Sequence, residues 1–379
     1  MRRKTRVRLS SLAIAFVAVS PVARAQTPIA QPQPERTGQE IYLAACAACH
    51  APDGKGQPRS VLGFEPPSSF PDFTDCAVSS PEPDLIWLAV IHLGGRARGE
   101  SHIMPAFADI LTDDEIGRVV EYLRSLCAEP GWPHGNLNFP RAFFTEKAFP
   151  ENETIFTVNA VPSRPHAIEN RIDYEHRVGK RAQYEVGVPF DLQQAGTGQW
   201  SRGLGDINLA YRHALYDSVS RGSIAAVGGE ITLPTGKETE GLGGGVTIFE
   251  GFGMWDQALP SDGFVQFHAG FERPANHDVA KNSLYWRTAI GKTFAQHRWG
   301  RVWSPMVEVL GAKELGADAR AEWDLVPQMQ VSLSVFQHVL LNVGVRVPVN
   351  ERETRSKAVM AYFLWDWFDG GLFELWRAH

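Results

Sequence analysis

The spacing of apolar side chains changes near Pro150, and this change constrains the fold more than any other feature of the chain. Before Pro150, apolar residues recur at helical spacing; after it, they recur at every second position in about a dozen short segments. A period of about 3.6 is typical of an amphipathic helix, and a period of two is typical of a strand with two unlike faces. The sequence therefore predicts a multi-domain protein, with a small all-α part followed by an antiparallel all-β part of about 12 strands.

The predicted strands fall within residues 151–379, each bounded by Gly, Pro, Asn or Asp. Their alternating positions are Phe156/Val158/Ala160, Ile172/Tyr174/His176, Tyr184/Val186/Val188/Phe190, Ile207/Leu209/Tyr211, Val227/Gly229/Ile231/Leu233, Val246/Ile248, Val265/Phe267/Ala269/Phe271, Leu284/Trp286/Ile290, Pro305/Val307/Val309, Val331/Leu333/Val335, Leu341/Val343/Val345/Val347 and Phe363/Trp365/Trp367.

The opposite faces of these strands carry charged and amide side chains, among them Arg171, Asp173, Glu175, Arg177 and Glu308. One apolar and one polar face is the pattern of a membrane β-barrel, with lipid outside and water in the lumen. A water-soluble β-sandwich has the same alternation with its apolar face turned inward, so periodicity alone leaves both open. Aromatic residues near strand ends favour the barrel, as interfacial girdles require: Trp200, Trp255, Trp286, Trp299, Trp303, Trp365, Trp367 and Phe368.

The N-terminus has the composition of a secretory signal. Basic residues within the first eight positions precede an apolar stretch over residues 12–19 and the small-x-small sequence Ala23-Arg24-Ala25. We expect cleavage after Ala25, because the apolar stretch is far shorter than the roughly 20 residues that span a bilayer. Residues 26–36, rich in Gln and Pro, are expected to form a flexible leader. The net charge of -6, without a basic run farther along the chain, argues against nucleic acid as a partner.

Three helices are predicted within residues 37–127. The first begins after the N-cap Thr37, the second spans Asp84 to Leu93, and the third begins at Thr112, which forms a capping-box pattern with Glu115. Residues 128–150 contain four prolines and several aromatic residues, a composition that no single helix can accommodate. We interpret this segment as the linker between the two parts.

The first predicted helix leads into Cys46-Ala47-Ala48-Cys49-His50. Two thiols at this spacing can form thioether bonds to the two vinyl groups of a haem, and the adjacent imidazole can bind the iron. A zinc site or a thioredoxin-like site would need a second ligand pair or a βαβ context, and the sequence has neither. The motif predicts one covalently attached haem c.

Met104, in the loop before the third helix, is the predicted sixth ligand, and His102 is the alternative. A thioether stabilises ferrous iron and raises the potential, whereas a second imidazole would lower it. With both axial positions filled, no coordination position is open for oxygen or peroxide chemistry. We find no catalytic constellation elsewhere, so the sequence favours an electron-transfer protein over an enzyme, although a terminal oxidoreductase role stays open.

The two other cysteines, Cys76 and Cys127, could form a disulfide in an oxidising compartment. The alternative is a pair of free thiols, because sequence alone does not measure whether the Cα atoms come within about 7 Å of each other.

Residues 37–127 resemble a class I cytochrome c domain, through Cys46–His50, the sequence Met104-Pro105-Ala106-Phe107 and the closing helix. The resemblance implies a compact helical fold, one haem with His50 and Met104 as ligands, and electron carriage without substrate turnover. The segment that carries Cys76 departs from this family.

Two short turns resemble those of outer-membrane barrels of the phenol-degradation transporter type. They are Gly203-Leu204-Gly205-Asp206 and Leu233-Pro234-Thr235-Gly236. The domain order is also similar to that of the fused cytochrome-porin proteins of iron-oxidising bacteria, although this barrel is shorter.

The leading hypothesis is a monohaem cytochrome that carries single electrons at the periplasmic face of the outer membrane, or across it. Its expected partners are outer-membrane lipid, a periplasmic redox protein and an electron donor or acceptor at or outside the membrane. A bilayer core about 30 Å thick implies further cofactors in partner proteins if electrons are to cross it. Two alternatives stay open: a solute channel with a redox-sensing or accessory haem domain, and a soluble periplasmic carrier whose β domain binds a partner.

Overall fold

The computed structural model describes residues 35–58, 60, 70–95, 102–194, 198–295, 301–316, 319–333 and 339–366. The predicted signal sequence and residues 26–34 of the predicted leader lie outside these ranges, as do Trp299, Trp367 and Phe368. Residues 36–379 form one compact unit and are described by themselves. No helix among the described residues has both the length and the apolar composition needed to cross a membrane.

The regular elements described in residues 36–127 are helices. They are α1 (Gly38–Ala45), α2 (Ala47–His50), α3 (Cys76–Ser79), α4 (Asp84–Leu93) and α5 (Asp113–Leu126). Thr37 caps α1 and Thr112 caps α5, and each forms a complete capping box with the glutamate three residues later. Each box satisfies backbone N–H groups that a helix start leaves unpaired, which is why these two helices begin where the sequence predicts.

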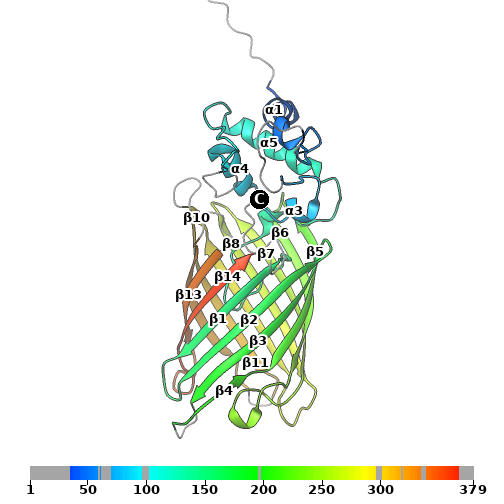
Figure 1. The fold of residues 1–379 in the computed structure, drawn as a ribbon. Helices are drawn as coiled ribbons and strands as arrows, with labels where there is room; N and C mark the ends of the chain where they lie inside the picture. The colour runs from blue at the N-terminus through cyan, green and yellow to red at the C-terminus, as the bar shows by residue number, and fades with distance from the viewer. Residues whose placement is uncertain are drawn as a thin grey trace, which may run out of the picture. The chain divides into compact units, whose positions relative to one another are not determined.

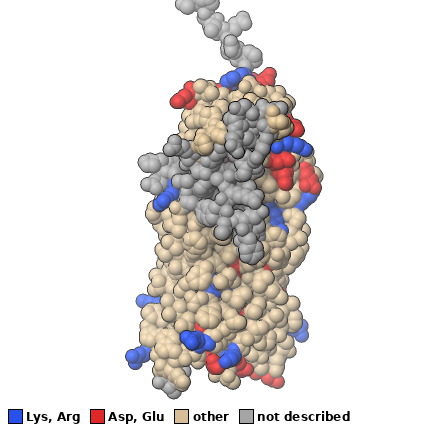
Figure 2. Space-filling view, viewed as in Figure 1, with Lys and Arg blue, Asp and Glu red and all other residues tan. Residues whose placement is uncertain are grey.

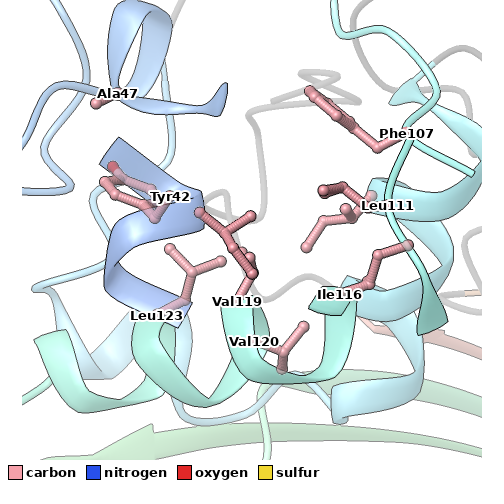
Figure 3. Close-up of a cluster of buried hydrophobic side chains, with 10 residues drawn as sticks. Tyr42, Ala47, Phe107, Leu111, Ile116, Val119, Val120 and Leu123 are labelled. Carbon is pink, nitrogen blue, oxygen red and sulfur yellow. The ribbon is translucent and has the colours of Figure 1, made fainter. Parts of the chain in front are cut away.

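The core of the helical domain lies between α1, α5 and the segment around Phe107 (Figure 3). Ile41 and Tyr42 of α1 are buried against the apolar face of α5, which presents Ile116, Val119, Val120 and Leu123 at helical spacing. The two helices approach closely at Gly38, where a Cβ atom would lie 1.9 Å from the carbonyl oxygen of Arg118. Glycine at this position therefore permits the α1–α5 packing.

The β part is a closed antiparallel barrel (Figure 1). Its wall contains 12 long strands among the described residues: β1 (Glu153–Val161), β2 (Ala167–Val178), β3 (Ala182–Gln194), β5 (Ile207–Ser218), β6 (Ser223–Leu233), β7 (Ile248–Leu259), β8 (Gly263–Pro274), β9 (Ser283–Lys292), β11 (Val302–Glu314), β12 (Glu322–Ser332), β13 (Val339–Pro348) and β14 (Ala358–Asp366). Consecutive long strands pair in order, and β1 pairs with β14, which closes the ring. The short strands β4 (Trp200–Leu204) and β10 (Phe294–Ala295) add to β3 and β11.

The barrel has its apolar side chains outside and many charged side chains inside. Phe156, Ile172, Val227, Phe267 and Val343 are all at least 40% exposed on the outer face. Figure 2 shows few charged side chains over the middle of the wall on the face in view, with Lys, Arg, Asp and Glu gathered at the lower rim. The fully buried charged residues of the described strands are seven carboxylates, Glu153, Asp173, Glu175, Glu185, Asp256, Glu308 and Asp324, and two arginines, Arg177 and Arg212.

Residues 137–151 lie inside the barrel, and we call them the plug; all but the last belong to the predicted linker, residues 128–150. The plug begins at the last residue of the 3₁₀ turn η3 (Gly135–Leu137) and leads directly into β1. Leu137, Ala142, Thr145, Ala148 and Phe149 are each no more than 2% exposed. The segment thus joins the two parts of the chain and also fills space between the strands.

Apolar plug residues belong to four hydrophobic clusters with inward-facing barrel residues. One cluster contains residues of β5, β6, β7 and β9; a second, residues of β8, β9 and β11; a third, residues of β1, β13 and β14; and a fourth, residues of β11, β12 and β14. On the remaining side, plug atoms bond to Glu175 of β2 and Gln183 of β3. Every long strand of the wall therefore takes part in holding the plug.

Candidate functional site

The Cys46–His50 motif lies at the junction of α1 and α2. Cys46 ends α1, and its carbonyl oxygen accepts hydrogen bonds from the N–H groups of Cys49 (3.1 Å) and His50 (3.0 Å). This tight turn carries both thiols and the imidazole on one short helical segment. Cys46 and Cys49 are half-buried and free of disulfide bonds, as thiols that form thioethers must be.

The imidazole of His50 lies beside the rings of two phenylalanines. The centroid of its ring lies 5.5 Å from that of Phe70 and 5.4 Å from that of Phe73. Burial lowers the pKa of His50 to about 4, so the imidazole is neutral at ordinary pH, the state that binds a metal. Its buried Nδ1 atom has no hydrogen-bond partner among the described residues.

Tyr42 holds the backbone that follows the motif. Its hydroxyl donates hydrogen bonds to the carbonyl oxygens of Ala51 (2.7 Å) and His50 (3.2 Å). Burial raises the pKa of Tyr42, which keeps the phenol protonated as a donor. Gln57 adds a hydrogen bond from Nε2 to the carbonyl oxygen of Ala47 (3.2 Å). The orientation of the segment that carries His50 is therefore fixed from both sides.

Met104 is half-buried and packs against the same hydrophobic core as Cys46, whereas His102 is exposed. The Met104 carbonyl oxygen accepts a hydrogen bond from Gly95 at 3.2 Å, which attaches its loop to the end of α4. These placements favour the thioether over the His102 imidazole as a ligand. Two free thiols and a neutral imidazole on one short helical segment, with a thioether packed against the core that Cys46 also contacts, form a donor set that fits a covalently attached haem.

Cys76 and Cys127 form a disulfide, with their Cα atoms 5.1 Å apart. Cys76 begins α3 and Cys127 follows α5, so the bond attaches the segment after the haem motif to the closing helix. The geometric question that the sequence leaves open is thus answered by the packing of α3 beside the end of α5.

Arg124, one turn before Cys127, makes a second connection to the same segment. Its Nε donates to Asp84 Oδ1 at 2.8 Å, and its other nitrogens contact the carbonyl oxygens of Ser79 and Glu82. The guanidinium carbon also lies 4.0 Å above the ring of Trp87. This buried charge is therefore paired, bonded and stacked, as a charge away from water must be.

A chain of aromatic contacts joins this arginine to the haem motif. The ring centroid of Trp87 lies 5.6 Å from that of Phe73, which in turn contacts His50. Sequence reasoning missed Tyr42, Phe73, Trp87 and Arg124, because these residues are separated along the chain and belong to no motif. Of these residues, only Arg124 has a feature visible in the sequence, because it is a charged residue on the last turn of a helix whose buried face is otherwise apolar.

Asp84 also bonds to the turn η3, which leads into the plug. Its carboxylate accepts from Asn136 Nδ2 at 2.7 Å, and its backbone N–H donates to Asn136 Oδ1 at 2.9 Å. Gly135 lies directly against the chain at Pro81 and Glu82, where a Cβ atom would be 2.1 Å from the Pro81 carbonyl oxygen. The segment after Cys76 therefore contacts both α5 and the residues that precede the plug.

Comparison with known proteins gives a family for the helical domain. Residues 36–127 match the family model described as Cytochrome c, a family whose members carry covalently bound haem c. The match covers about a quarter of the chain. No curated protein matches the chain significantly.

Solved barrels show weak likenesses to the β part. The KdgM porin has 9% identity and a TM-score of 0.37, covering 57% of this chain and 99% of its own. The NanC porin has 8% identity and a TM-score of 0.39, covering 57% and 98%. An outer membrane channel from Pseudomonas putida has 10% identity and a TM-score of 0.43, covering 60% and 100%. The strand pairing, rather than these low scores, establishes the barrel. The chain thus combines a cytochrome c domain at residues 36–127 with a closed 12-stranded antiparallel barrel.

Proposed function

We propose that this protein is a monohaem electron carrier that its own barrel anchors in the outer membrane, with the cytochrome domain in the periplasm. The observation that carries the proposal is the donor set of the cytochrome domain: two free thiols on the same short helical segment as the neutral imidazole of His50, and Met104 packed against the core that Cys46 also contacts. With a protein ligand on each side of the iron, no coordination position is open to a substrate. We therefore propose that the domain carries single electrons without turnover of a substrate.

The proposed haem-binding residues have separate tasks. Cys46 and Cys49 form the thioether bonds, and His50 and Met104 are the axial ligands. When bound, haem c supplies a one-electron Fe(III)/Fe(II) couple. Tyr42 fixes the backbone of His50, and the rings of Phe70 and Phe73 keep water from the imidazole side. A dry, rigid site favours electron transfer because little reorganisation accompanies the change in iron charge.

The outer face of the barrel supports the membrane location. Large apolar side chains point outward along the strands, while carboxylates and amides are fully buried on the inner face. A soluble sandwich needs the reverse arrangement, because its apolar face forms the core. Closed antiparallel barrels with this polarity are the outer-membrane type. The signal sequence predicted at residues 1–25 supports export.

The partners we propose are one-electron proteins. A single haem cannot bridge a bilayer core about 30 Å thick by itself. We therefore propose a periplasmic redox protein on one side of the exchange, and a donor or acceptor at the membrane that carries further cofactors. No catalytic role beyond this transfer is part of the proposal.

The test uses the full-length protein in liposomes. Wild type should carry one covalent haem, accept an electron from a soluble reductant and return it to a soluble ferric acceptor, as read by haem absorbance. A Cys46→Ser/Cys49→Ser variant should lose the covalent haem and the redox cycle but keep heat-modifiable migration of its barrel. The matched control, Cys76→Ser/Cys127→Ser, removes the other cysteine pair and should keep both haem and cycle.

Wild-type protein that carries haem but does not cycle between oxidation states would contradict the carrier role. Recovery of the folded protein in the soluble fraction would contradict the membrane anchor. These two outcomes are independent, so each part of the proposal is tested by itself.

A further inference from the structure

The lumen holds the plug through its backbone as well as its side chains. Glu308 of β11 accepts hydrogen bonds from three consecutive plug N–H groups, those of Phe143 (3.1 Å), Phe144 (3.0 Å) and Thr145 (2.6 Å). Asp256 of β7 accepts from Ala148 N–H at 2.8 Å. These two buried carboxylates therefore bind four backbone N–H groups of the plug by charge-assisted hydrogen bonds.

Donors from the wall satisfy plug carbonyl oxygens in the same way. Arg287 of β9 donates to the Phe144 oxygen at 2.9 Å, and Arg212 of β5 donates to the Lys147 oxygen at 2.7 Å. The Tyr362 hydroxyl of β14 donates to the Arg141 oxygen at 2.6 Å. These contacts come from widely separated strands, so the plug is held across the lumen and not along one wall.

The two plug cations are neutralised by carboxylates. Arg141 pairs with Glu153 at 2.8 Å and with Glu175 at 2.5 Å. Lys147 pairs with Glu151 of the plug and lies 3.8 Å from Glu153. Removing one partner of a buried pair leaves an uncompensated charge, which is strongly destabilising. The wall is therefore built for a segment that carries positive charge at these positions.

From these contacts we infer that the plug closes the lumen, so that the barrel serves as an anchor in its resting state, and that displacing the plug opens a cation-selective pore. Closure follows from the apolar clusters and hydrogen bonds that join the plug to all 12 long strands. Cation selectivity follows from the excess of carboxylates on the inner face of the described wall. Its buried charges are seven carboxylates and two guanidinium groups, and its half-buried inward-facing charges include Arg171, Arg287 and Arg346 beside Asp191, Glu230, Glu250 and Glu272. The inference rests on the proposed membrane barrel but not on the haem.

Planar-bilayer recording of the full-length protein tests the inference. Wild type should show a closed baseline. A variant in which residues 138–149 are replaced by a Gly/Ser run of equal length should conduct steadily, with a reversal potential under a KCl gradient that has the sign of K⁺ over Cl⁻. Glu308→Gln should open more often than wild type, because one amide oxygen replaces two carboxylate oxygens. Glu353→Gln, at an exposed position outside the lumen, is the matched control and should stay closed.

Three results would overturn the inference: steady conduction by wild type, a closed baseline in the folded replacement variant, or an anion-selective pore. Heat-modifiable migration establishes folding in each case, and failure of the barrel to insert at all would instead contradict the proposed membrane anchor.

If the replacement variant does not fold, thiol labelling tests whether the lumen is closed. Ala142→Cys inside the lumen should resist a charged maleimide until denaturation, whereas Ala106→Cys, exposed on the cytochrome domain, should react at once. Equal rates in the native state would show that the lumen is open.

Discussion

Met104 is the single residue whose replacement should change the redox behaviour most without breaking a covalent bond. Met104→Leu keeps the volume and the packing against the core, but removes the sulfur that we propose as the sixth ligand, and a thioether ligand stabilises ferrous iron. Axial ligands set haem potentials over about 0.8 V, so we expect a fall in midpoint potential on the order of 0.1 V. Met329→Leu, on β12 of the barrel, is the control for the same chemical change. Redox titration that gives both variants the wild-type potential would remove Met104 from the ligand set.

Glu115 gives the cytochrome domain a defined pH dependence. A hydrogen bond from the Thr112 backbone, followed by the contact with Arg36, lowers the pKa of Glu115 from 4.5 to about 2. A carboxyl group whose folded pKa is lowered stabilises the domain above its unfolded pKa, and this contribution disappears as the pH falls from about 4.5 to about 2.

We therefore expect Glu115→Gln, which can keep the cap hydrogen bonds but not the charge, to lower the thermal midpoint at pH 6 and to approach wild type near pH 2. The exposed Asp114→Asn on the same helix is the control. Melting curves followed by haem absorbance over this pH range check the expectation. A difference that grows on acidification would show that the sign is wrong.

At the scale of elements, the disulfide should be the largest single contribution to the stability of the cytochrome domain. It joins residues 51 apart, and a loop of this length is worth about 2–4 kcal/mol of unfolding free energy, mainly through the unfolded chain. Cys76→Ser/Cys127→Ser should lose this amount in urea unfolding monitored at the haem, while the barrel transition stays in place. Treatment of wild type with a dithiol reductant should reproduce the loss. Unchanged unfolding in both cases would mean that Arg124 and its contacts suffice to hold the segment.

Most helices and strands follow the predicted pattern, and the exceptions have physical causes. α4 spans Asp84–Leu93, the predicted residues, because its apolar run is bounded by Pro83 and Gly94. In β7, by contrast, the predicted pair Val246/Ile248 overlaps the strand only at its first residue, Ile248. Its outward positions include Gly251 and Gly253, whereas its inward Phe252 and Met254 pack with the plug, so the alternation is inverted locally.

The alternating pattern in the sequence also reveals only the end of β12, for another reason. Pro327 lies on its outer face, and the pairing with β13 stops after Leu325 and resumes at Gln328, since proline has no N–H group to donate.

The plug could not be predicted at all. Its prolines and aromatic residues are those of a linker, and the contacts that hold it come from strands that are up to 221 residues distant along the chain. Local sequence patterns do not reveal such long-range contacts.

At the scale of the whole molecule, the proposed membrane anchor can be tested by placing a charge at two depths on the apolar outer face. Val227 lies near the middle of β6 and is 44% exposed. Val227→Arg should destabilise the membrane-inserted barrel by about 2–4 kcal/mol, the cost of an arginine at the bilayer midplane. Leu259→Arg, at the end of β7, should cost about 0–1 kcal/mol, because the end of a strand lies near the interface. Urea titration in lipid vesicles measures both. Equal costs at the two depths would point to a barrel that is not in a bilayer.

The order of segments along the chain has a consequence for biogenesis. The wall closes only when β14 pairs with β1, through eight residue pairs from Glu153↔Asp366 to Ala160↔Val359. The plug lies immediately before β1, so it is already attached to the first edge of the sheet when the last edge arrives. Enclosing it costs the entropy of a short loop and needs no encounter with a separate partner. On the inference drawn above, the lumen is therefore filled as soon as the ring closes, and assembly passes through no stage with an open pore.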